Sequence, residues 1–228
     1  MPPRRSYSSY NDGCAAAHAL DLIGDRWTMI IVRELLLGPK RFTEIQRDIV
    51  GIGPTVLTQR LHELETIRIA RRRRLPAPAR VDVYELTPWG LRLEAVNAAL
   101  STWAIESPSL PLEADMSPDT VVLAMRAHAR PDATISRDQR VTLYLTDSRI
   151  ADSEPVAYTA HISARETSIE KTPAPAEADA KINASTADWK ACIIGGAPFD
   201  QLSDIRVVGS REASRALIRV TSLGTVSN

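Results

Sequence analysis

The segment from Pro54 to Glu65 carries side chains that could recognise the bases of duplex DNA. Leu57, Leu61 and Leu64 follow one another at spacings of four and three residues, which places them on one face of a helix. At about 100° per residue the opposite face presents hydroxyl and amide groups, which can donate to and accept from base edges in the major groove. The expected base-reading residues are Thr55, Thr58 and Gln59, with Arg60 and His62 as flanking candidates.

An arginine cluster follows this helix, and its chemistry is different. A guanidinium can pair with phosphate or enter a minor groove without reading the major-groove pattern of donors and acceptors. Two stretches with β-strand character, 67–75 and 81–86, flank the turn-forming residues 76–79, so the arginines belong to a hairpin, or wing. Such clusters are more often solvated faces, but the position of this one favours a DNA contact. The expected contacts are Arg72, Arg73, Arg74 and Arg80.

Short helices must position these groups. Apolar-rich helices are predicted at 15–23 and 27–37, and Thr43-Glu44-Ile45-Gln46 has the pattern of a capping box that opens a short helix to Val50. Gly51-Ile52-Gly53-Pro54 then forms a turn that puts proline at the first position of the next helix. Two short helices joined by a tight glycine-containing turn have the layout of a helix-turn-helix.

A further helix, capped by Thr87-Pro88, carries large apolar side chains at a heptad-like spacing. They form either a dimer interface or a stripe packed within their own domain, and we expect the dimer. The residues are Trp89, Leu93, Val96, Leu100 and Trp103.

Charge and proline content divide the chain in two. The 28 basic and 28 acidic residues cancel overall, but 1–106 carries a balance of +3 and 107–228 one of −3. The proline-containing stretch 107–116 is read as a linker between a DNA-binding and dimerisation domain, 1–106, and a second domain, 117–228. In that second domain helices at 117–129, 187–195 and 211–220 accompany strands at 141–147, 156–164, 167–172, 180–185 and 205–208. This order predicts α+β architecture with a largely antiparallel sheet.

Other chemistry finds little support in the sequence. Cys14 and Cys192 form no CxxC pair, the four histidines show no ligand spacing, and no GxGxxG, P-loop, HExxH or GxSxG motif is present. We therefore expect neither an enzyme nor a metal or cofactor. No apolar run reaches about 18 residues, and the start, Met1 to Tyr10, is polar, so we expect a cytoplasmic protein that does not contact membranes.

Four separated runs resemble the HxlR family of winged-helix regulators: CAAAHALDLIGDRWTMIIVRELLLGPKRFTEI, GIGPTVLTQRLHELE, RRRRL and VYELTPWG. The resemblance spans about Cys14 to Trp103 and implies a bacterial, homodimeric, DNA-binding regulator. The sequence departs from the family where a small residue and glycine usually follow Leu64-Glu65, because this chain has Thr66-Ile67-Arg68. Arg68 would occupy a turn that often requires positive φ, a conformation that strains a residue other than glycine.

The same resemblance places Cys14 where some family members sense oxidants or electrophiles. A position next to the start of a helix can lower a thiol pKa. The alternative is a small buried hydrophobe, which we favour because the neighbours Ala15, Ala16 and Ala17 offer no cationic partner.

The C-terminal part is similar to sterol-carrier-protein type 2-like domains in the segments 132–135, 189–196 and 207–210. Such domains enclose an apolar cavity and often bind lipids, which implies a small hydrophobic effector. Apolar side chains of this region would line the cavity or form a plain core. The candidates are Val122, Met125, Leu143, Leu145, Ile162, Trp189, Ile193, Phe199 and Leu202.

The sequence thus predicts an α+β protein with an N-terminal winged helix-turn-helix. Its expected function is that of a transcription repressor that binds a palindromic duplex operator as a homodimer, controlled by a hydrophobic effector or by modification of Cys14. The alternative is a lipid carrier or an uncharacterised enzyme in which the N-terminal module mainly dimerises. A carrier need not show the salt-dependent DNA affinity that a basic patch confers.

Overall fold

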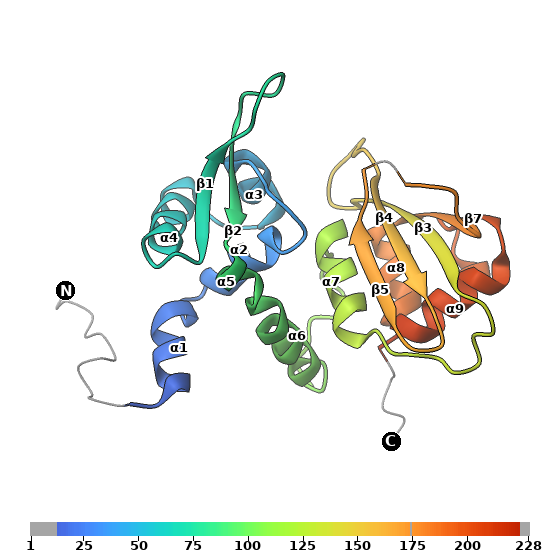
Figure 1. Cartoon of the computed structure of the whole chain (residues 1–228). Helices are drawn as coiled ribbons and strands as arrows, with labels where there is room; N and C mark the ends of the chain where they lie inside the picture. The colour runs from blue at the N-terminus through green and yellow to red at the C-terminus, as the bar shows by residue number, and fades with distance from the viewer. Residues whose placement is uncertain (1–12, 174, 224–228) are drawn as a thin grey trace. The chain divides into compact units, whose positions relative to one another are not determined.

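The chain is mixed α and β and forms two compact units, 1–97 and 98–228. The computed structural model describes residues 13–173 and 175–223 (Figure 1). The polar stretch Met1 to Tyr10 lies outside the described residues. The boundary between the units falls inside a helix, ten residues before the stretch that the sequence analysis read as a linker.

The N-terminal unit consists of helices and one hairpin, in the order that the sequence pattern indicates. The elements are α1 (Ala15–Ile23), α2 (Thr28–Leu35), α3 (Phe42–Asp48), α4 (Pro54–Thr66), β1 (Ala70–Arg74), β2 (Asp82–Leu86), α5 (Pro88–Leu91) and the first part of α6 (Leu93–Ala104). Its core is formed by apolar side chains that recur at helical spacing. They include Ile31, Leu35, Ile45, Leu57, Leu61 and Leu64.

Helices α3 and α4 form the helix-turn-helix, with Pro54 at the start of α4 as the sequence predicts. The predicted capping box is wrong in its register. Helix α3 begins at Phe42, so Thr43 lies inside it, and the Glu44 carboxylate instead accepts a 2.7 Å hydrogen bond from the backbone N–H of Arg41. The acidic residue of the proposed box therefore does cap the helix, but two residues earlier than expected.

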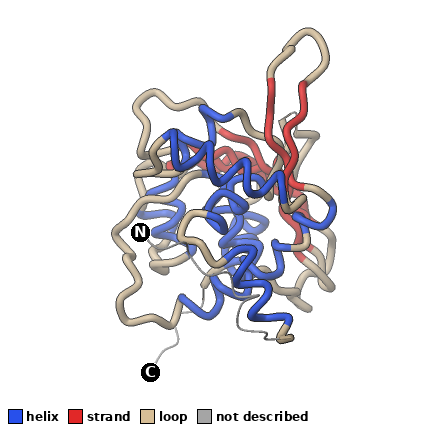
Figure 2. Tube along the Cα trace, turned by 90° about the vertical axis from the view of Figure 1, so that its left-hand side faces the viewer, coloured by secondary structure: helices blue, strands red, loops and turns tan. Residues whose placement is uncertain are grey.

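The hairpin begins later than its apolar pattern suggests because a turn intervenes after α4. Arg68 takes a positive φ of 60° there, so the turn has the conformation that strains a residue other than glycine. Strand β1 pairs antiparallel with β2, and β2 in turn exchanges two backbone hydrogen bonds with Lys40, at 3.0 and 2.8 Å to Tyr84. The hairpin is therefore tied to the segment between α2 and α3. Figure 2 shows it extending past the helices of its own unit.

The Thr87-Pro88 cap forms as predicted, since the Thr87 hydroxyl accepts a 3.0 Å hydrogen bond from the Gly90 N–H. Gly90 is required for close packing, because a Cβ there would lie 2.1 Å from the Ile69 carbonyl oxygen. The single helix expected after this cap is interrupted at Arg92, which separates α5 from α6.

The C-terminal unit is a five-stranded sheet with helices on one face (Figure 1). Its elements are α7 (Pro118–His128), β3 (Gln139–Thr146), β4 (Val156–Ile162), β5 (Thr167–Lys171), β6 (Ala180–Ser185), α8 (Thr186–Ile193), the 3-10 turn η2 (Phe199–Gln201), β7 (Arg206–Gly209) and α9 (Arg211–Thr221). The strand order is β5-β4-β3-β6-β7. Only the β3–β6 pairing of the described strands is parallel, so the sheet is largely antiparallel.

The core of this unit lies between the sheet and its helices. Alternate residues of β3 and β4 point inward, and Trp189 of α8 is fully buried, with its indole N–H 3.2 Å from the Met125 sulfur. A second buried contact joins α7 to the sheet. The Tyr158 hydroxyl donates a 2.6 Å hydrogen bond to Asp119, which also pairs with Lys171 at 3.0 Å.

Candidate nucleic-acid interface

The outward face of α4 carries the side chains expected to read bases. Thr55, Thr58, Gln59 and His62 are exposed, whereas Leu57, Leu61 and Leu64 are buried. The Gln59 amide donates a 3.0 Å hydrogen bond to Glu63, which lies one turn later on the same face. This contact orients the Gln59 side chain along the helix in the DNA-free protein.

Arg60 differs from its neighbours on α4. Its side chain is only 17% exposed, and its guanidinium pairs with Glu63 and, at 3.4 Å, with Asp25. It therefore links α4 to the loop before α2. Its placement favours a positioning role for Arg60 over direct base contact.

The arginines of the hairpin are exposed, but most of them are paired. The Glu85 carboxylate forms ion pairs with the guanidinium groups of Arg71, at 2.7 Å, and Arg73, at 2.8 Å. The Asp82 carboxylate pairs with the guanidinium of Arg72 at 2.7 Å. The hydrogen bond from Arg73 holds the pKa of Glu85 below its usual value, and the same contact raises the pKa of Arg73. Arg74 and Arg80 are also exposed and, in the part of the chain that the structure describes, form no ion pair.

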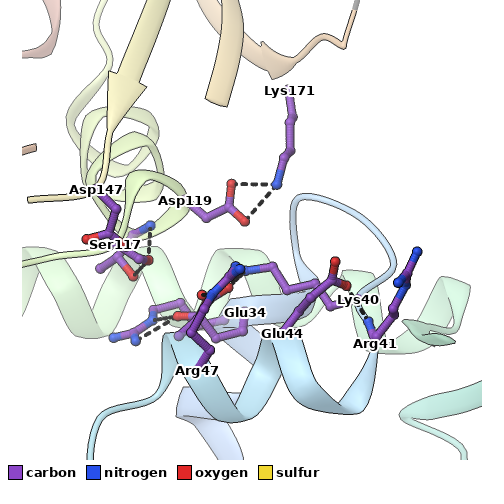
Figure 3. Close-up of polar contacts among 12 residues, drawn as sticks. Glu34, Lys40, Arg41, Glu44, Arg47, Ser117, Asp119, Asp147 and Lys171 are labelled. Atoms are coloured by element: carbon purple, nitrogen blue, oxygen red, sulfur yellow. Dashed lines mark hydrogen bonds and ion pairs between the residues drawn. The ribbon is translucent and has the colours of Figure 1, made fainter. Parts of the chain in front are cut away.

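Beneath this surface lies a buried charge cluster that the sequence analysis missed (Figure 3). The Lys40 ammonium lies 2.7 Å from a Glu34 oxygen and 2.9 Å from an Asp48 oxygen. Arg33 and Arg47 pair with the second oxygens of the two carboxylates at 2.9 and 2.8 Å. Because Lys40 also bridges to β2 through its backbone, the cluster fixes α2, α3 and the hairpin relative to one another.

The predicted seam along α5 and α6 is largely exposed. The exposed fractions are 48% for Trp89, 38% for Val96, 47% for Leu100 and 79% for Trp103, while Leu93 is half-buried. Helix α1 has no buried residue, and its Leu20 is 56% exposed.

Cys14 stands at the start of α1 and is exposed, so its interpretation as a small buried hydrophobe is wrong. The backbone N–H groups of Ala17 and Ala16 lower the pKa of its thiol. They can do so because α1 begins at Ala15 and directs its first amides toward residue 14. Cys192 is buried, and burial raises its pKa to about 11.

The nine residues proposed for a ligand cavity all belong to the C-terminal unit, and all except the half-buried Leu202 are buried. They share the apolar layer between the sheet and its helices. A surface depression of about 360 Å³ lies elsewhere in this unit, on the outer side of α8, and none of the nine lines it. There the Lys190 ammonium donates hydrogen bonds to the carbonyls of Leu112 and Ala114, which fixes the segment before α7 against α8.

No group of three or more His, Cys, Asp or Glu side chains is arranged to hold a metal ion within 13–173 and 175–223. Over the same ranges no helix combines the length and hydropathy needed to cross a membrane.

The N-terminal unit has known relatives. Residues 22–109 match the HxlR-like helix-turn-helix family. The HTH-type transcriptional regulator YodB of Bacillus subtilis is 42% identical over 87 residues, which are 38% of this chain and 77% of YodB. YvaP of the same organism is 37% identical over 89 residues, or 39% of this chain and 82% of YvaP.

Solved structures also match this part of the chain. The reduced form of YodB has 36% identity, covers 43% of this chain and 97% of its own, and gives a TM-score of 0.39. The redox regulator HypR in its oxidised form has 30% identity and a TM-score of 0.39, and the match covers 42% of this chain and 100% of the HypR chain.

Helices α3 and α4, with the exposed polar face of α4 next to the basic hairpin, define a helix-turn-helix protein. With 42% identity to a relative of which it covers 77%, the chain belongs to the HxlR-like helix-turn-helix family of DNA-binding transcription regulators.

Proposed function

We infer that this chain represses transcription by binding a palindromic operator as a homodimer. The observation that carries this proposal is the exposed polar face of α4 beside an exposed arginine hairpin. Thr55, Thr58 and Gln59 would read base edges in the major groove, with His62 at the margin. Arg72, Arg73, Arg74 and Arg80 would supply phosphate or minor-groove contacts, which add affinity more than specificity.

The homodimer rests on the apolar surface of α1, α5 and α6. The apolar side chains of Trp89, Leu100 and Trp103 are exposed to water, which is unfavourable. Pairing with a second copy of the chain would bury them. A two-fold dimer presents two α4 helices, so it calls for two half-sites about one helical turn apart, or a multiple of that.

Control of this binding is proposed at two places. The C-terminal unit, which we propose to be a sterol-carrier-like domain, would bind a small hydrophobic effector within its apolar layer. Cys14 would react with oxidants or electrophiles, which its exposure and lowered pKa support. The structures of quinone-bound YodB and of oxidised HypR concern relatives and agree with such a role.

The proposal is tested by selection of duplexes from a random pool with the purified full chain, followed by footprinting on the region beside its gene. We expect enrichment of a palindrome whose affinity falls steeply with salt. Binding that shows neither sequence preference nor salt dependence would favour the alternative, a lipid carrier dimerised by its N-terminal unit.

The effector is tested separately, by extraction of the purified protein for co-bound lipids and titration of hydrophobic metabolites into the operator-binding assay. An effector must bind the DNA-competent and incompetent states with different affinity, a coupling that is typically about 1 to 3 kcal/mol. Peroxide or an aldehyde should release operator from the wild type and not from Cys14→Ser. A response to none of these compounds removes both control sites from the proposal.

A further inference from the structure

The base of the hairpin is an internal ion-pair array and not a row of free cations. On one face Glu85 lies directly across from Arg71 and diagonally from Arg73, so its two oxygens hold both guanidinium groups. The Glu85 side chain is 12% exposed, whereas those of Arg71 and Arg73 are 61% and 43% exposed. The carboxylate is therefore largely shielded from water, with one oxygen bound to each arginine.

The opposite face repeats this arrangement with a second carboxylate. Asp82 lies diagonally across from Arg72 and accepts a 2.7 Å hydrogen bond from its guanidinium. The backbone N–H of Arg72 also donates to Glu65, at 3.0 Å, which joins the hairpin to the end of α4. Three of the five hairpin arginines thus face an acidic side chain of the same protein.

Arg74 lies at the end of β1, directly across from Asp82, and Arg80 lies in the loop before β2. Neither forms an ion pair among the residues that the structure describes. The hairpin therefore has a charge-paired base and a cationic tip.

We propose that Glu85 and Asp82 weaken the binding of the hairpin to DNA phosphates, and so set the affinity of the chain for DNA of any sequence. This inference rests on the proposed DNA contact of the hairpin. A phosphate binds a guanidinium through the same N–H donors that a carboxylate uses. Phosphates must therefore displace Glu85 and Asp82 from the arginines, or approach them against the repulsion of two fixed negative charges.

The same phosphate contacts form on operator and non-operator DNA, so a change in them alters the affinity of the chain for both. Sequence-independent binding comes almost entirely from phosphate contacts, while base reading by α4 is a separate contribution. Carboxylates on the hairpin lower the first contribution and leave the second in place. Glu85 and Asp82 thus lower the affinity for operator and non-operator DNA alike, without contact to a base.

The test measures binding of the full chain to a random-sequence duplex by fluorescence anisotropy across a salt series. Glu85→Gln and Asp82→Asn preserve shape and remove one negative charge each. We expect each to tighten random-sequence binding by about two- to fivefold, the range that an exposed ion pair represents. The dependence of log K on log salt should steepen by about one unit for each arginine released.

Two control variants accompany this test. Glu170→Gln makes the same charge change on an exposed residue of β5 and should leave the affinity unchanged. Arg74→Ala removes a cation from the tip and should lower both the affinity and the slope. Thermal melts confirm that each variant is folded, and because Glu85 and Asp82 lie on opposite faces, either variant alone can decide the question.

Unchanged or weaker binding of both folded carboxylate variants, with Arg74→Ala still weakening it, overturns this inference and leaves the DNA contact of the hairpin intact. The ion pairs would then serve only the stability of the hairpin. A wild type whose random-sequence binding does not depend on salt overturns the proposed function itself, and this inference with it.

Discussion

The Lys40 ammonium and the Glu34 carboxylate form a buried ion pair, with Nζ 2.7 Å from Oε2 and the Glu34 side chain fully enclosed. Asp48 completes the pairing at 2.9 Å. Removing one partner of a buried pair leaves an uncompensated charge inside the protein, whereas the intact pair itself contributes little net stability. The cluster therefore makes the fold sensitive to loss of any one member.

Lys40→Met should accordingly lower the free energy of unfolding by about 3 to 5 kcal/mol. Urea denaturation followed by circular dichroism measures this change. The matched control is Lys181→Met, at an exposed lysine of β6, which should change stability by less than about 0.5 kcal/mol. Equal effects of the two substitutions would show that the buried cluster is not a stability determinant.

This cluster also marks a limit of the sequence analysis. Periodicity located the helices and strands well, because leucines such as Leu57 and Leu61 must face a core. Glu34 lies among the apolar residues of α2, and a charge at a core-facing position was the available signal. Lys40 lies six residues after Glu34, in the loop before α3, and Asp48, which pairs with Lys40, lies on α3, so only the folded backbone brings the three together.

Two other differences between the structure and the sequence-based predictions have local causes. Strand β1 starts at Ala70 because the turn at Arg68 uses the preceding residues. Cys14 is exposed because α1 buries nothing within this chain, although its sequence is rich in alanine and leucine. An apolar composition predicts that a helix is buried, but it does not tell whether the residues that bury it belong to the same chain.

The two thiols should react very differently. Cys14 is exposed with a lowered pKa, whereas Cys192 is buried with a pKa raised to about 11, and only the thiolate is an effective nucleophile. Iodoacetamide should therefore label one cysteine per native chain, with a pH midpoint below the usual value of 9.0 for a thiol. Mass spectrometry identifies the site, and Cys14→Ser should abolish native labelling. Two thiols labelled at similar rates would contradict these environments.

Asp132 should make the C-terminal unit sensitive to acid. Hydrogen bonds from the hydroxyl and N–H of Thr134, and then from Arg219, lower its pKa from 3.8 to about 2. A carboxyl group whose pKa is lower in the folded state stabilises that state above its usual pKa, and this contribution is lost as pH falls toward 2.

Melting temperatures of the wild type and Asp132→Asn should therefore differ near pH 5 and converge between about pH 4 and 2. Asp138→Asn, at an exposed neighbour in sequence, is the control and should follow the wild type throughout. A gap between wild type and Asp132→Asn that stays constant down to pH 2 would rule out this linkage.

The exposed face of α6 should hold two copies of the chain together. Leu100→Glu places a charge in the proposed apolar interface and should convert a dimer into a monomer, halving the mass measured by light scattering at micromolar concentration. Thr102→Glu makes a similar change about 200° around the helix and should leave the dimer intact. A monomeric wild type, or a dimer that survives Leu100→Glu, would remove α6 from the interface.

Substitution of Gln59 tests whether the exposed face of α4 reads DNA sequence. The Gln59 amide can form a bidentate contact to a base, which contributes about 1 to 3 kcal/mol of discrimination. Anisotropy titrations of wild type and Gln59→Ala against the selected operator, and against operators mismatched one base pair at a time, measure that discrimination. We expect Gln59→Ala to remain folded and to lose preference at one defined position of each half-site. An unchanged preference at every position would contradict base reading by this face of α4.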